Sequence, residues 1–141
     1  MNIKNKICHV SRLLNIKMPD IIFNDLIGFS YSKGTLYLRR IGNEKELLFL
    51  SLHELRHYYQ DLYIKNNNDS LSIVWKKEMD NYNLKCYINY NIELDAYAFS
   101  YLVLKHIFKI NYDLPYEIKD KVLDYIKKFK ILYSIIINYK L

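Results

Sequence analysis

Two histidines and a glutamate near the middle of the chain are of the types that can hold and use a divalent metal ion. They occur as His-Glu-x-x-His at His53, Glu54 and His57, within a segment, Leu47–Asp61, that has the features of a helix. A helix turns about 100° per residue, so His57 lies one turn beyond His53 on nearly the same face, and both imidazoles can bind one ion. Glu54 lies on the flank nearer His57, where it can accept a proton from a metal-bound water.

A motif with only three fixed residues also occurs by chance, on surface helices whose His and Glu are solvated or salt-bridged. Two features of the neighbouring residues favour a metal site. An apolar face lies opposite the histidines, and Phe49 and Leu50 near the other face indicate a helix buried on two sides. Buried polar side chains need partners, and a metal ion would be one. The apolar face consists of Leu48, Leu52, Leu55, Tyr59 and Leu62.

A zinc ion held by two histidines needs a third protein ligand. The predicted helix Ile92–Phe108 begins with Glu93, which shares a face with the small residues Ala96 and Ser100, so this face can approach the motif helix closely. Asp95 lies about 200° away on an ideal helix, so the two carboxylates cannot bind the same ion unless the helix starts between them. Alternatively, Glu93 and Asp95 only stabilise the start of a helix. We expect His53, His57 and Glu93 to bind Zn²⁺.

The order His53–His57 followed by Glu93-x-x-Ala96 resembles the gluzincin metallopeptidases. The small size resembles the minimal bacterial and phage-associated members, including the ImmA/IrrE-like proteins, and the resemblance covers about Thr35–Leu104. It implies a zincin-like fold, in which a short antiparallel sheet packs on the motif helix and further helices follow. It also implies zinc-dependent hydrolysis of peptide bonds.

Two positions depart from the gluzincin pattern. Arg56 stands where the family usually has a small residue before the second histidine. Tyr97 stands where several members have an Asp or Asn that orients the zinc histidines. Asp95 is the carboxylate that can take over that task.

The remaining pattern predicts an α+β fold in a single domain, residues 1–141. Turn residues separate the elements, among them Met18-Pro19-Asp20, a hairpin turn at Ser32-Lys33-Gly34 and a polar break at Asn66–Asp69. The expected helices are Asn2–Leu14, Glu44–Lys65, Leu71–Tyr82, Ile92–Phe108 and one from Pro115 to Lys130 or beyond, and the expected strands are Ile21–Asn24, Ile27–Tyr31 and Thr35–Arg40.

Composition restricts the partners and the compartment. The formal net charge is +6, but the lysines are scattered and there is no recognition helix or aromatic RNA-binding motif, so we do not expect nucleic acid as a partner. The start of the chain lacks the features of a signal peptide, and the apolar run Ile131–Ile137 is too short to span a membrane. Cys8 and Cys86 are expected to be free thiols in a cytoplasmic protein.

Two functions follow from these patterns. The first is a zinc metallopeptidase in which Glu54 is the general base and strand Thr35–Arg40 binds a protein or peptide substrate along its edge. Tyr82, Tyr87 and Tyr90 are then candidates for stabilising the oxyanion. The second is a non-catalytic module of the same fold that binds protein or nucleic acid. A purely structural zinc site has no need of a base at Glu54, which favours the enzyme.

Overall fold

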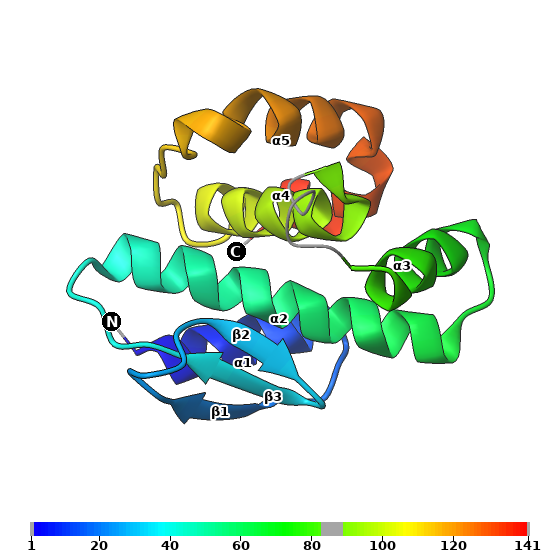
Figure 1. Cartoon of the computed structure of the whole chain (residues 1–141). Coiled ribbons are helices and arrows are strands. Elements are labelled where there is room, and N and C mark those ends of the chain that lie inside the picture. The colour runs from blue at the N-terminus through cyan, green and yellow to red at the C-terminus, as the bar shows by residue number, and fades with distance from the viewer. Residues whose placement is uncertain (1, 83–88, 141) are drawn as a thin grey trace.

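Helix α2 (Glu44–Asn66) passes through the middle of the molecule, between a small sheet on one side and helix α4 (Asn91–His106) on the other (Figure 1). The computed structural model describes residues 2–82 and 89–140. The order is α1 (Ile3–Leu13), β1 (Asp20–Phe23), β2 (Ser30–Ser32), β3 (Thr35–Leu38), α2, α3 (Ser70–Asp80), α4, α5 (Tyr116–Lys128), the 3₁₀ helix η2 (Lys130–Tyr133) and α6 (Ser134–Ile137). The α+β prediction is confirmed.

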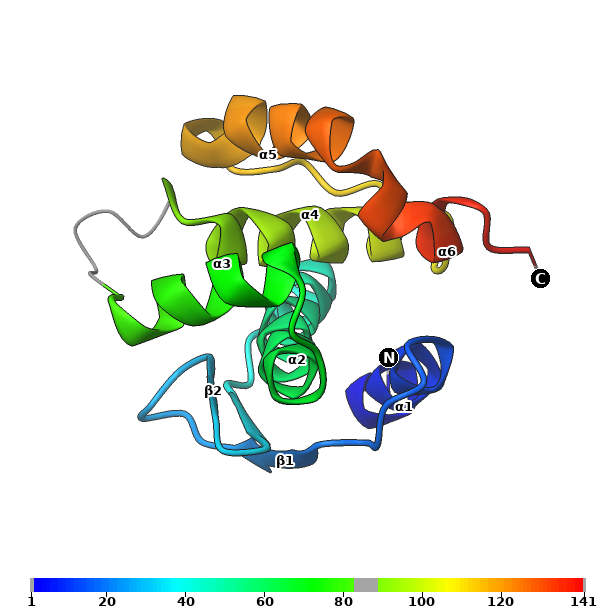
Figure 2. The ribbon, with the colours of Figure 1, turned by 90° about the vertical axis from the view of Figure 1, so that its right-hand side faces the viewer.

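The layers follow one another as sheet, α2, α4 and α5, and α1 lies beside the sheet against α2 (Figure 2). Apolar side chains from each layer meet in one core. Leu36 and Leu38 of β3 are fully buried, as are Leu52 of α2, Phe99 of α4 and Val122 of α5. Because α2 is covered on both sides, its polar residues between the layers are buried too.

Side-chain caps mark the start of α1, α2 and α3. Asn2 accepts a hydrogen bond from the backbone N–H of Asn5, and Asn43 does the same for Glu46 at the start of α2. Asp69 accepts from Ser72 and so starts α3. Such caps satisfy backbone donors that have no partner within the helix.

The three strands are in the order β1-β3-β2, with β3 antiparallel to β2 and parallel to β1. The sheet is therefore mixed and not purely antiparallel as predicted. The hairpin between β2 and β3 turns at Lys33 and Gly34, both with positive φ, as a two-residue type I′ turn requires. Strand β2 begins only at Ser30, because the preceding residues form a turn in which Gly28 adopts a φ of 82°.

The prediction of one continuous last helix from Pro115 was wrong. Pro115 occupies the N-cap position, one residue before α5, and α5 ends at Lys128 because Phe129 has φ −119° and ψ 33°, outside the helical region. Two short helices, η2 and α6, follow and return the chain to α4. No helix in the described ranges is long and apolar enough to cross a membrane. Of the two cysteines, Cys8 is a free thiol, and Cys86 lies outside the described residues.

Candidate metal centre

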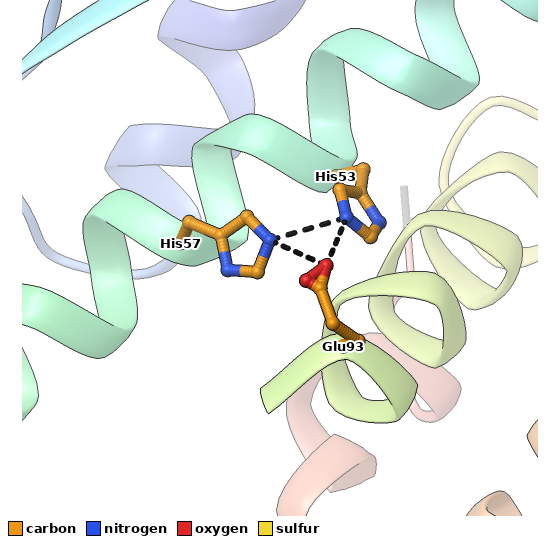
Figure 3. A group of neighbouring side chains, drawn as sticks. All are labelled: His53, His57 and Glu93. Atoms are coloured by element: carbon orange, nitrogen blue, oxygen red, sulfur yellow. Dashed lines mark hydrogen bonds and ion pairs between the residues drawn. The ribbon is translucent and has the colours of Figure 1, made fainter. Parts of the chain in front are cut away.

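Helices α2 and α4 bring His53, His57 and Glu93 together (Figure 3). The two histidines project from α2 toward α4, and Glu93 projects back from the first turn of α4. Ala96 and Ser100 on the same face of α4 are fully buried, as expected for small residues where two helices approach closely. The three residues that we expected to bind zinc are therefore positioned to hold one metal ion.

The donor atoms are close together. Glu93 Oε1 lies 3.0 Å from the Nε2 of His53 and 3.0 Å from the Nε2 of His57, and the two Nε2 atoms are 3.1 Å apart. Nitrogen ligands lie about 2.0–2.1 Å from zinc, which places tetrahedral ligands about 3.3 Å from each other. The observed spacing therefore fits an ion of this size with little movement.

The hydrogen bonds of Gln60, on the side of His57 away from Glu93, determine which nitrogen of the His57 ring carries a hydrogen and which presents a lone pair to Glu93. Gln60 donates through Nε2 to the Ile92 carbonyl at 2.9 Å and to Asp95 at 2.8 Å, so its Oε1 is the atom that faces His57 Nδ1 at 2.8 Å. That oxygen can only accept, and Nδ1 must therefore carry a hydrogen. In neutral His57 the Nε2 lone pair then faces a carboxylate oxygen, and only a cation between them makes this arrangement favourable.

The charges of the site depend on the same contacts. Burial opposes the charge on His57, but the hydrogen bond and the negative charge of Glu93, with a further contribution from Glu54, raise its pKa to about 9. Burial opposes the charge on Glu93 as well, and its bonds to His53 and His57 nevertheless hold the pKa of this carboxyl far below its usual range. The centre thus attracts a cation, either a proton on the imidazole or a metal ion.

His53 is held differently from His57. Its Nδ1 is buried and has no hydrogen-bond partner among the described residues. The ring of Tyr97 lies against it, with the ring centroids 4.2 Å apart. Tyr97, which stands where several gluzincins have an Asp or Asn, therefore contacts His53 through its ring.

Asp95 points away from the metal centre, as expected from its angle on the helix. Arg56 donates to it through Nε at 2.7 Å and through a terminal nitrogen at 3.2 Å, and Tyr133 donates at 2.7 Å. Asp95 is fully buried and Arg56 nearly so. We expected Asp95 to be the carboxylate that orients a histidine, and it contacts His57 only through Gln60.

Glu54 lies at the wall of the pocket onto which the centre opens. The pocket has a volume of about 630 Å³, and Glu54 itself is 8% exposed. Three carboxylates line it, those of Glu54, Asp61 and Glu93, and its described lining includes no lysine or arginine. The rest of the wall consists of Phe29, Ser30, Tyr31, His53, His57, Met79, Tyr82 and Ile92.

Of the three tyrosines that were candidates for stabilising an oxyanion, Tyr82 is the one in the described pocket lining. Tyr90, whose ring centroid lies 5.3 Å from that of Tyr82, donates its hydroxyl to the Asn81 carbonyl. Tyr87 lies outside the described residues. A further tyrosine at the pocket, Tyr31, was not predicted, and its hydroxyl donates to Asp61 at 2.5 Å.

The predicted substrate edge on β3 was wrong. Strand β3 pairs with β1 on one side and with β2 on the other, so its backbone groups are already used. Strand β2, an outer strand of the sheet, carries Ser30 and Tyr31 at the pocket. Among the described strands, β2 is therefore the one that has an unpaired edge and also lies beside the candidate metal centre.

Sequence reasoning also missed Gln60, which follows His57 by three residues and so lies on the same side of α2. A glutamine in a helix buried on two sides needs polar partners, and that was the signal available.

No known protein family, curated protein or solved structure matches this chain.

Proposed function

We propose that this chain is a zinc-dependent peptidase of the gluzincin type, with a zincin-like fold. The main support is one observation: His53, His57 and Glu93 converge within hydrogen-bonding distance, and Glu54 lines the same pocket. Two imidazoles and one carboxylate are the ligand set of many hydrolytic zinc sites, which keep a further position open. A structural zinc site is normally closed by four protein ligands, and the described residues near this centre contribute three.

Zinc, when bound, supplies a Lewis acid that polarises the scissile carbonyl and makes an attacking water more acidic. The residues of the chain supply the rest. Glu54 accepts the proton of the attacking water and transfers it to the leaving amine. The only other carboxylates in the described pocket wall are Glu93, which faces the histidines, and Asp61, which is hydrogen-bonded to Tyr31. This leaves Glu54 as the best placed base.

The substrate that suits this pocket is an extended peptide. The outer strand β2 can pair with it through backbone hydrogen bonds, as in other cases of strand addition. Apolar groups beside the centre, including Phe29, Met79 and Ile92, can take up its side chains. Tyr82 at the pocket wall is then the candidate donor to the oxyanion.

The first test is the metal. Native mass spectrometry of the protein purified without chelator should show one zinc per chain, and His57→Ala should lose it. A folded wild-type chain that takes up no zinc would contradict the proposal.

The second test is the base. Glu54→Gln should keep both fold and zinc, but hydrolysis should fall about 10²–10⁴-fold, because only the proton acceptor is removed. The substrate can be a single protein, so cleavage is best followed by autolysis and by a proteome-wide profile of wild type against Glu54→Gln. Identical profiles with zinc in both proteins would favour the non-catalytic module.

A further inference from the structure

A continuous chain of buried hydrogen bonds connects His57 to the C-terminal part of the molecule. It runs from His57 Nδ1 to Gln60, from Gln60 to Asp95, and from Asp95 to Arg56 and Tyr133. Gln60, Asp95 and Tyr133 are fully buried, and Arg56 is 3% exposed. Water therefore does not compete for these bonds, and each group has few other positions available.

Every bond in this chain has one permitted direction. The Asp95 carboxylate and the Ile92 carbonyl can only accept, so the Gln60 nitrogen must face both of them. The Gln60 oxygen is thereby turned toward His57 and requires a hydrogen on Nδ1. Asp95 in turn is fixed by the two nitrogens of Arg56, which has a planar guanidinium that matches a carboxylate.

We propose that Gln60, held by Asp95, is the positioning residue of the metal centre. It fixes both the rotation of the His57 ring and the tautomer that presents Nε2 to the metal. The inference rests on the proposed function for its metal, but the contacts that carry it are formed by the chain's own residues.

The contrast with His53 supports this assignment. Both histidines face Glu93 through Nε2, but on the other side of its ring His53 packs against Tyr97, and its Nδ1 has no hydrogen-bond partner among the described residues. On the side away from Glu93, His57 is thus held by a hydrogen bond and His53 by ring packing. Hydrogen-bonded groups behind a metal-binding histidine typically contribute 10–100-fold to metal affinity, because they fix the ring and raise its basicity.

The test uses two substitutions of the full-length chain and zinc alone as ligand. Gln60→Met has a similar shape but no acceptor for His57, and it leaves Asp95 bonded to Arg56 and Tyr133. Tyr133→Phe removes one hydroxyl at the far end of the chain of bonds. Zinc affinity, measured by competition with a chromophoric chelator, should fall 10–100-fold in Gln60→Met and by less in Tyr133→Phe. Ser51→Ala, a buried change on α2 whose hydroxyl bonds only to Leu47 of its own helix, should leave it unchanged.

A second readout follows the hydrogen on His57 Nδ1 by NMR of the metal-free protein. In wild type this hydrogen should give a slowly exchanging resonance, and in Gln60→Met it should disappear while circular dichroism shows an unchanged fold. Zinc affinity equal to wild type in Gln60→Met, or an exchange-protected Nδ1 hydrogen that persists in it, would overturn the assignment. Failure of wild type to bind zinc would instead overturn the proposed function, and the NMR signal would still decide whether Gln60 sets the tautomer.

Discussion

Glu93 and Asp95 stand two residues apart at the start of α4, both are buried, and both face side chains of α2, yet their surroundings differ in kind. Asp95 meets a guanidinium and two neutral donors. Glu93 meets two imidazoles, which can be neutral. Arginine does not lose its proton in proteins, so the charge of Asp95 is permanently compensated. The charge of Glu93 is compensated only when a proton or a metal ion is present.

This difference separates a structural carboxylate from one that can bind an exchangeable ion. A buried carboxylate with a fixed counter-charge contributes to the fold and has no capacity left for a ligand. A buried carboxylate whose partners are metal-binding groups retains that capacity. The two regions are linked through Gln60, which bonds to Asp95 on one side and to His57 on the other.

The largest change in stability is expected when the permanent pair is broken. Asp95→Ala leaves Arg56 charged and buried without a counter-ion, and we expect the free energy of unfolding to fall by about 3–5 kcal/mol, measured by urea denaturation. Asp80→Ala is the matched control, because Asp80 pairs with Lys76 on an exposed helix surface and such pairs contribute only about 0–1 kcal/mol. Equal losses in the two variants would contradict the role assigned to Asp95.

The second substitution addresses the other carboxylate. Glu93→Gln keeps the size of the side chain but removes a charged ligand, so zinc affinity should fall by more than the roughly 100-fold upper range for residues behind a ligand. The fold should persist, because no permanent charge is left unpaired. If zinc binds to Glu93→Gln as tightly as to wild type, and a folded Asp95 variant has lost it, the two carboxylates have been assigned the wrong way round.

The sequence was sufficient to predict features that depend on the spacing of residues along one helix, or on the faces through which two helices pack. Helical spacing placed His53 and His57 on one side of α2, and the small residues Ala96 and Ser100 indicated where α4 could approach. The same spacing separated Glu93 from Asp95. Both helices are where the pattern predicted them, with ends that differ by one or two residues.

What the sequence did not predict depends on contacts between distant segments. Arg56 and Asp95 are 39 residues apart, and Tyr133 is another 38 residues from Asp95, so no local pattern pairs them. The parallel pairing of β1 with β3 is likewise non-local, and it occupies the edge that we had predicted for a substrate. The end of α5 at Phe129 was missed because that position has no glycine or proline.

The smallest expected effect distinguishes the charge of Arg56 from its shape. Arg56→Lys keeps a cation beside Asp95 but cannot donate two parallel bonds, and it loses the contacts of the guanidinium with the rings of Tyr59 and Phe99, 4.3 and 4.8 Å from their centroids. We expect a loss of about 1.5–3 kcal/mol in unfolding free energy, the range for one hydrogen bond to a charged group and less than for Asp95→Ala.

Thermal and urea denaturation of Arg56→Lys beside Asp95→Ala would measure this order. A loss in Arg56→Lys as large as in Asp95→Ala would show that the planar geometry of arginine, and not its charge, stabilises this region. The contrast with Glu93 would then lie in hydrogen-bond geometry. The intermediate loss that we expect would instead show that the surroundings of Asp95 and Glu93 differ mainly in the permanent positive charge beside Asp95. Lysine preserves this charge while losing the second hydrogen bond.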